Sequence, residues 1–325
     1  MPTIRADRPI AALSGTPSQG VAAIGAYAAL VDPGYGTPVS VDLAPDAAGS
    51  RPAMSPEDMV GDFVAARLAS RRADAPLVIG LCGAQGSGKS TIAAALVRRF
   101  DAAATLSLDD LYLTHAERQA LARTVHPLFA TRGVPGTHDL PLGSRVLAAL
   151  DAGEPVALPR FSKGDDDRAP RRDWPIAPTP CDLLILEGWC VGARPQDDAA
   201  LAIPVNALER DEDRDGRWRT ASNAALAGPY RDFFARIDAL VLLAAPDVAT
   251  VAGWRRDQEQ ALRRAGRSPA AMDDAALARF VAHYERLTRH ILAEMPARAD
   301  LVVPLDRDRA LAIDLLHRRA VTSAA

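Results

Sequence analysis

The residues most able to do chemistry lie close together between positions 83 and 91. They read Gly83-Ala84-Gln85-Gly86-Ser87-Gly88-Lys89-Ser90-Thr91 and fit the pattern G-x-x-x-x-G-K-[ST], which binds nucleotide phosphates. Glycines let the backbone N–H groups wrap tightly around phosphate oxygens. Lys89 supplies a positive charge for the β- and γ-phosphates, and the Ser90 hydroxyl is suited to ligate Mg²⁺. The motif therefore predicts a binding site for a nucleoside triphosphate and Mg²⁺.

The sequence on either side predicts the elements that would position this loop. Residues 77–82 form a short apolar run with β-branched residues, which is typical of a buried strand. Residues 92–100 carry apolar side chains at helical spacing. A helix that begins here points its N-terminus at the phosphates, where free N–H groups and the helix dipole favour negative charge. The order of strand, motif and helix argues against a plain glycine-rich surface loop.

Two further apolar runs end in acidic residues. Residues 104–108 lead into Asp109, and residues 183–186 lead into Glu187. Carboxylates at the C-terminal edge of a parallel sheet lie where such sheets bind ligands. We expect Asp109 to orient an acceptor hydroxyl and take its proton, and Glu187 to be the acid of a Walker B strand. The predicted Mg²⁺ ligands are Ser90, Asp109 and Glu187.

Plainer interpretations remain open for several of these polar segments. Asp109, or more readily Asp110, would cap a following helix. The Gly- and Pro-rich segment 132–140 is either a loop that closes over a polar substrate or a simple connector. The charged segment 162–172 either belongs to the site or is a solvated face, and residues 211–215 are predicted to be a solvated face or turn.

Apolar runs alternate with helical patterns along the rest of the chain. Further strands are predicted at 240–244 and 300–304, with a short one at 156–161 that would join the same sheet. Helices are predicted at 55–72, 115–124, 142–150, 206–227, 248–264, 273–294 and 309–319. This alternation predicts an α/β fold of the P-loop NTPase type, a parallel sheet with helices on both faces. Residues 1–53, rich in Ala, Pro and Gly, are predicted to be an extension that precedes it.

The composition excludes several classes of protein. The 325 residues carry a net charge of −3, which is no electrostatic footprint for nucleic acid or an anionic membrane. No apolar run approaches the roughly 20 residues of a membrane span, and the first residues do not resemble a secretory signal. Cys82, Cys181 and Cys190 form no C-x-x-C pair. We therefore expect free buried thiols and a cytoplasmic protein, and the oligomeric state stays open.

Taken together, these landmarks resemble the D-glycerate 3-kinases, a family of P-loop kinases related to the pantothenate, uridine and phosphoribulose kinases. The resemblance extends from about residue 77 to 309. It lies in the segments 83–91, 107–114, 132–139, 158–161, 167–170, 174–175 and 187–189. The P-loop indicates only the superfamily. Segment 132–139, with Asp167-Arg168-Ala169-Pro170 and the Glu187-Gly188-Trp189 turn, is the most specific part.

The resemblance implies transfer of the ATP γ-phosphate to the 3-hydroxyl of D-glycerate. Asp109 matches the family's acceptor-activating acid and Glu187 its Walker B acid, while Tyr112, His138 and Asp139 would face the acceptor. The candidate cations for the glycerate carboxylate are Arg132, Arg160, Lys163 and Arg168. Residues 54–325 would then form the P-loop kinase domain, with a helical lid at about 247–295. Candidate arginines to close over the phosphates are Arg255, Arg263 and Arg264, with plain surface residues as the alternative.

One position departs from the family pattern. Ser162 stands where the family has an acid before the lysine that this chain keeps as Lys163, and Asp165, Asp166 or Asp167 would have to supply that carboxylate. Two other functions also stay open. One is a kinase for another small alcohol, of the pantothenate or nucleoside type; the other is a nucleotide-dependent regulatory ATPase.

Overall fold

The computed structural model describes residues 54–71, 75–264 and 272–312. The predicted extension at 1–53 lies outside these residues. A five-stranded sheet runs through the centre in the order β2-β5-β1-β6-β7, and every neighbouring pair is parallel. Its strands are β1 (Leu77–Gly83), β2 (Ala103–Ser107), β5 (Leu183–Gly188), β6 (Ala239–Ala244) and β7 (Leu301–Pro304). These five strands match five of the six predicted for the sheet.

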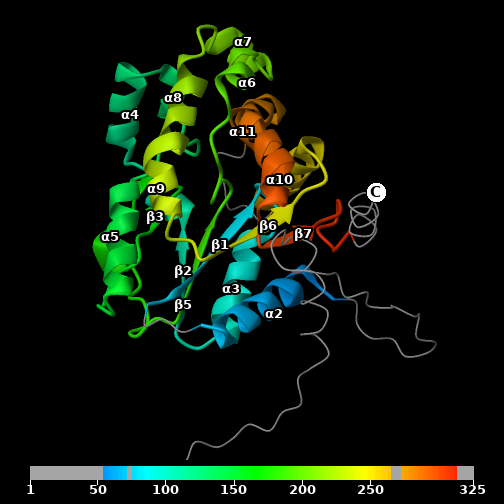
Figure 1. Ribbon diagram of the computed structural model, residues 1–325. Coiled ribbons are helices and arrows are strands. Elements are labelled where there is room, and N and C mark those ends of the chain that lie inside the picture. Colours follow the sequence, from blue (N-terminus) through cyan, green and yellow to red (C-terminus); the bar gives the residue numbers. More distant parts are fainter. Residues whose placement is uncertain (1–53, 72–74, 265–271, 313–325) are drawn as a thin grey trace, which may run out of the picture.

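Helices cover both faces of the sheet, so the predicted α/β fold is confirmed (Figure 1). On one face, α2 (Pro56–Ala69) and α3 (Lys89–Arg99) pack on a core that includes Ile79, Val241 and Val303. On the other face, α5 (Leu140–Asp151) and α9 (Arg231–Phe234) lie against the sheet. Both faces of the strands are buried, which explains their nearly continuous apolar sequence.

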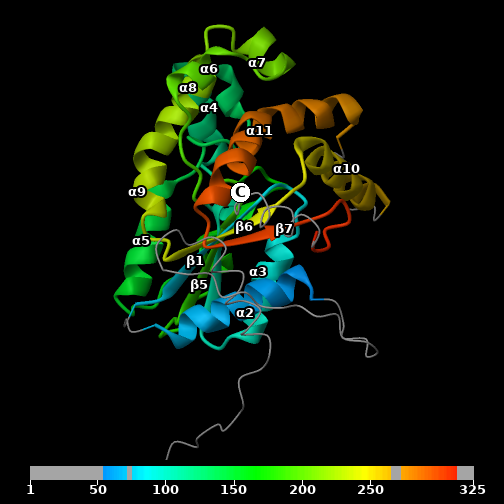
Figure 2. The ribbon, with the colours of Figure 1, turned by 45° about the vertical axis from the view of Figure 1, so that its right-hand side comes forward.

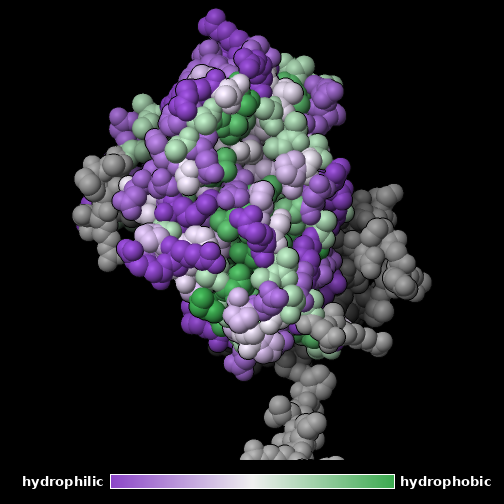
Figure 3. All heavy atoms as spheres, turned by 90° about the vertical axis from the view of Figure 1, so that its left-hand side faces the viewer, coloured by the Kyte–Doolittle hydropathy of each residue, from purple (hydrophilic) through white to green (hydrophobic). Residues whose placement is uncertain are grey.

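A group of helices stands above the C-terminal ends of the strands (Figures 1 and 2). It consists of α4 (His115–Thr124), α6 (Asp198–Ala202), α7 (Ala207–Glu212), α8 (Arg217–Ala225), α10 (Val248–Arg264) and α11 (Asp274–Glu294). Seen from the side of α5, α8 and α9, hydrophilic and hydrophobic residues are interspersed over the surface (Figure 3). In the described part of the chain, no helix combines the length and the apolar character that a membrane span requires.

Local capping explains where several helices begin. Ser55 accepts a hydrogen bond from the Asp58 backbone, and the Asp58 carboxylate accepts one from Ser55 in return. Pro56 occupies the first turn, where its missing N–H costs nothing. Thr114 and Glu117 form the same reciprocal pair at the start of α4. These caps stabilise each helix end by about 1 kcal/mol.

One predicted strand is wrong, and one predicted helix is contradicted over the part that the structure describes. Residues 156–161 do not join the main sheet; Ala157 forms an isolated bridge with Ile176, and β3 (Phe161–Ser162) pairs only with β4 (Asp167–Arg168) in a separate hairpin. Pro159 interrupts the run because it has no N–H to donate to a ladder. The predicted helix at 309–319 is not present at 309–312, where Arg309 has a positive φ of 67° and Leu311 bridges to Leu305; its remainder lies outside the described residues.

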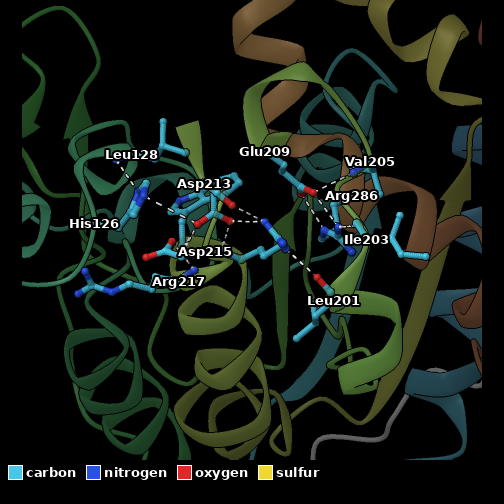
Figure 4. A network of polar contacts seen from close by, with 12 residues as sticks. His126, Leu128, Leu201, Ile203, Val205, Glu209, Asp213, Asp215, Arg217 and Arg286 are labelled. Carbon is cyan, nitrogen blue, oxygen red and sulfur yellow. Dashed lines mark hydrogen bonds and ion pairs between the residues drawn. The ribbon is translucent and has the colours of Figure 1, made fainter. Parts of the chain in front are cut away.

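The acidic run 211–215 is not a simple solvated face. Asp213 is fully buried and accepts hydrogen bonds from the backbone of Trp218 and Arg219 and from the Arg219 guanidinium, at 2.9 Å. A second buried pair joins Glu209 to Arg286 at 2.7 Å nearby (Figure 4). These pairs connect α7 to α8 and to the middle of α11, and the removal of one partner would leave a buried charge unpaired. The pattern of charges in the sequence does not reveal these ion pairs, because only three-dimensional packing brings the arginines to the acids.

Candidate functional site

The predicted phosphate-binding loop connects β1 to α3 at the C-terminal edge of the sheet. Gly86 and Gly88 have φ values of 83° and 87°, a left-handed conformation that glycine adopts without strain. Gly86 also packs against α10: a Cβ atom added there would lie 2.6 Å from the Cβ of Trp254. Lys89 is the first residue of α3, so the free N–H groups of that helix face the loop. The loop has the form that a nucleotide phosphate requires.

The two predicted acids meet at this edge of the sheet. The register places Ser107, the last residue of β2, opposite Glu187 of β5, and Asp109 follows two residues later. The Ser90 hydroxyl donates to Glu187 Oε1 at 3.3 Å. The other oxygen of this buried carboxylate has no hydrogen-bond partner among the described residues. A hydroxyl beside an unsatisfied carboxylate oxygen fits a hard divalent cation such as Mg²⁺.

Asp109 lies on a short 3-10 turn, Leu108–Leu111, and both of its carboxylate oxygens are engaged. Tyr112 donates its hydroxyl to Oδ1 at 2.6 Å, and Lys163 donates to Oδ2 at 2.7 Å. Burial opposes the charge, but the Lys163 and Lys89 ammonium groups and the two hydrogen bonds hold the pKa of Asp109 well below its usual range. Asp109 is therefore ionised at neutral pH.

Asp110 does not cap a helix. Its carboxylate accepts hydrogen bonds from the Phe161 backbone N–H at 3.0 Å and from Arg160 at 3.2 Å, while Ser107 caps the 3-10 turn. Burial raises the pKa of Asp110 despite these contacts. Asp110 thus anchors the start of the β3–β4 hairpin beside Asp109.

The hairpin turn carries the charged residues that the sequence left unresolved. Of its aspartates, Asp166 is the one paired with two cations, Arg118 and Arg132, and it also contacts the His115 ring. Burial raises the pKa of Asp166, but the His115 hydrogen bond and the two guanidinium charges lower it overall. Asp165 instead accepts from the Ser162 hydroxyl at 2.6 Å.

Arg118 was missed by the sequence analysis. It is fully buried on α4 and also donates to the carbonyl oxygens of Leu113 and Ala130. An arginine within a polar helical pattern gives no sequence signal of burial, because its partner Asp166 lies 48 residues away.

The segment 132–139 lies beside Asp109 through Tyr112. His138 forms an isolated bridge with Tyr112, and the two rings stack with centroids 4.8 Å apart. Asp139 caps α5 through Leu142 N and pairs with Arg168 at 2.8 Å, so both of its oxygens have protein partners. Tyr112, His138 and Arg168 are thus brought together, and Asp139 holds Arg168 in place.

The predicted lid arginines differ in position. Arg255 pairs with Glu259, lies over the Phe280 ring and lines a small cavity with Gln85 of the P-loop. Arg263 donates to the Met272 carbonyl at the far end of α10, and Arg264 has no hydrogen bond within the described part of the chain. Only Arg255 of the three is placed beside the P-loop.

Arg309, which the sequence analysis did not single out, also contacts the P-loop. It donates to the Gly86 carbonyl at 2.6 Å, and its guanidinium lies over the Trp254 ring at 5.3 Å. Trp254 in turn donates to the Arg307 carbonyl at 2.6 Å. These contacts connect the P-loop, α10 and the segment after β7.

The phosphate-binding loop, the paired acids and the parallel sheet define a P-loop kinase. Residues 78–193 match the model of the Phosphoribulokinase / Uridine kinase family. The Uncharacterized kinase mug58 of Schizosaccharomyces pombe is 37% identical over 227 residues, which are 64% of this chain and 78% of that protein. The chain belongs to the phosphoribulokinase and uridine kinase family.

Two further relatives have a named acceptor. The chloroplastic D-glycerate 3-kinase of Arabidopsis thaliana is 34% identical over 263 residues, which are 75% of this chain and 53% of that protein. The chain thus spans about half the length of the plant protein. The structure of D-glycerate 3-kinase from Cryptococcus neoformans var. grubii superposes with a TM-score of 0.64 at 25% identity, covering 79% of this chain and 97% of that one.

Proposed function

We propose that this kinase transfers the γ-phosphate of ATP to the 3-hydroxyl of D-glycerate and forms 3-phosphoglycerate. The observation that carries the proposal is Asp109, an ionised carboxylate beside the P-loop lysine and contacted by a lysine from a cation-rich hairpin. A carboxylate so placed suits an acceptor hydroxyl, and the cations suit an acceptor that is itself an anion. The relatives that are glycerate kinases support this choice of acceptor.

In the proposed mechanism, the residues of the P-loop hold the ATP phosphates. Residues 83–91 surround them with backbone N–H groups, and Lys89 bridges the β- and γ-phosphates. Ser90 and Glu187 would hold Mg²⁺, with Asp109 alongside as the third candidate ligand. The ion, when bound, neutralises the charge that develops on the phosphates. Asp109 orients the 3-hydroxyl for in-line attack and accepts its proton.

The acceptor carboxylate would be held by cations on and around the hairpin. Arg132, Arg160 and Arg168 each already have an acidic partner: Asp166, Asp110 and Asp139 respectively. Lys163 differs because its side chain is 61% exposed and its partner is Asp109 itself. We propose that Lys163 leaves Asp109 for the glycerate carboxylate, which frees Asp109 to take the proton. Arg255 would approach the phosphates from the lid and exclude water.

The test is ADP release with ATP, Mg²⁺ and a panel of acceptors: D-glycerate, L-glycerate, pantothenate, uridine and none. Phosphoglycerate mutase then distinguishes the 3-phosphate from the 2-phosphate. Turnover on D-glycerate alone, with the 3-phosphate as product, supports the proposal. Turnover on another alcohol instead would assign the site to that acceptor, and ADP release without any acceptor would indicate a regulatory ATPase.

A further inference from the structure

Tyr230 lies at an irregular turn between two helices and has no role in the mechanism above. It ends a π-type turn, Leu226–Tyr230, between α8 and α9, in which Gly228 leaves the helical conformation and Pro229 follows. Such turns occur often at functional sites. The side chain is 1% exposed, and its hydroxyl contacts two residues of segment 132–139: it accepts from Gly136 N–H at 3.0 Å and lies at hydrogen-bond distance from His138 Nδ1.

These contacts determine which nitrogen of His138 carries the proton. A phenol has one proton to donate, and burial raises the pKa of Tyr230 well above its usual value, so the proton stays on the oxygen. The oxygen already accepts from Gly136, which leaves His138 Nδ1 as the acceptor of the Tyr230 proton. The neutral ring then carries its hydrogen on Nε2.

The other edge of the His138 ring lacks a hydrogen-bond partner in the described part of the chain. Nε2 is buried and has no hydrogen-bond partner among residues 54–71, 75–264 and 272–312. Burial also lowers the pKa of His138 to about 3, so the ring is neutral at neutral pH. A buried N–H without an acceptor is costly, which favours a ligand or water that supplies an oxygen. The ring faces Tyr112, which holds Asp109.

We propose that Tyr230 is a positioning residue that holds His138 in its Nε2–H form, so that His138 donates a neutral hydrogen bond to an oxygen of the phosphoryl acceptor. The inference rests on the proposed function and refines it. A neutral N–H donor pairs with a carboxylate or hydroxyl oxygen. It disfavours an ammonium or amide N–H at the same place, because two donors would face each other. The atom of the acceptor at this place is therefore an oxygen.

The tautomer is measured directly by long-range ¹H–¹⁵N NMR of the full chain labelled in histidine. The spectrum of His138→Gln assigns the His138 signals. We expect wild-type protein to show the Nε2–H form, and Tyr230→Phe, which keeps the ring but removes the hydroxyl, to shift His138 toward a mixture of tautomers. A wild-type Nδ1–H form, or a Tyr230→Phe spectrum identical to wild type, would overturn the role of Tyr230.

The acceptor contact is tested on the same samples with a non-hydrolysable ATP analogue and D-glycerate. We expect D-glycerate to move the Nε2 resonance in wild-type protein; an unmoved resonance despite saturating D-glycerate means that a buried water fills the place, and it refutes the contact. If D-glycerate does not bind at all, the proposed function fails. The NMR test is then repeated with the acceptor that the panel identifies. The tautomer result stands independently of that outcome.

Kinetics separate positioning from a merely structural role. With D-glycerate, or with the acceptor that the panel identifies, Tyr230→Phe should lower kcat/KM for the acceptor roughly tenfold and leave the KM for ATP unchanged, the scale of one hydrogen bond. Gln at position 138 keeps a donor but has no Nδ1 for Tyr230 to hold. Tyr230→Phe should therefore cost less than about twofold in the His138→Gln background. An equal cost in both backgrounds would show that Tyr230 acts through packing alone.

Discussion

Asp109 has two hydrogen-bond donors, and each has a separate consequence for the reaction. Tyr112 is fixed by stacking on His138, whereas Lys163 reaches in from an exposed turn. The first contact orients the carboxylate permanently, and the second one depends on what else is bound. At the scale of single residues, the proposed mechanism thus combines a fixed donor with one that is exchanged when the acceptor binds.

Replacement of the proposed base should lower the rate of phosphoryl transfer without loss of nucleotide affinity. We expect Asp109→Asn to lower kcat by about 10²- to 10⁴-fold, because the amide cannot accept the proton of the acceptor hydroxyl. Nucleotide affinity, measured by calorimetry with an ATP analogue, should remain. Activity within tenfold of wild type would mean that Asp109 is not the base.

Loss of the exchangeable cation should weaken acceptor binding. We expect Lys163→Met to raise the KM for D-glycerate roughly 10- to 100-fold, the scale of a charge-assisted hydrogen bond, with the KM for ATP unchanged. Lys163→Arg keeps the positive charge and serves as the matched control. Equal KM values for D-glycerate in wild type and Lys163→Met would remove Lys163 from the acceptor site.

At the scale of elements, the five strands of the sheet could be predicted because each is a buried apolar run that ends in a turn or an acid. The phosphate-binding loop could be predicted because all its chemistry is local. The β3–β4 hairpin could not, since two-residue strands carry no periodicity. Arg118 and Tyr230 could not be predicted from the sequence for another reason: their partners Asp166 and Gly136 lie 48 and 94 residues away.

The contact between the P-loop and α10 yields a prediction for an element. Gly86→Ala would place a Cβ atom 2.6 Å from Trp254 in a residue with φ of 83°. We expect it to reduce nucleotide affinity at least tenfold, because the loop must leave the form that cradles phosphate. The matched control is Gly253→Ala in α10, where the added Cβ has no neighbour within 4 Å. That change should leave affinity unchanged and stabilise the helix by about 0.5–1 kcal/mol. Equal affinities for both variants would contradict this packing.

At the scale of the whole molecule, the buried His138 makes folding sensitive to acid. Its pKa is about 3 in the folded protein and near the ordinary 6.5 in the unfolded chain. Between these values the unfolded chain binds the extra proton, so the free energy of unfolding falls as pH drops below about 6.5, and this contribution is fully present above it.

Urea unfolding at pH 7, 6 and 5 measures this dependence. His138→Gln should lose less stability than wild type between pH 6 and 5, by up to roughly 1.4 kcal/mol per pH unit, the maximum for one proton. Parallel losses in both proteins would mean that His138 is protonated in the folded state.

The hairpin that carries Lys163 and Asp166 stands outside the five-stranded sheet and forms no ladder with it. Its sequence can therefore diverge without disturbing the strands or the P-loop, which keep the same nucleotide. If the proposed role of Lys163 holds, mutations in this turn would alter the acceptor without a change of nucleotide. Ser162 lies at the end of β3, directly before that turn, so variation at this position bears on the same part of the hairpin.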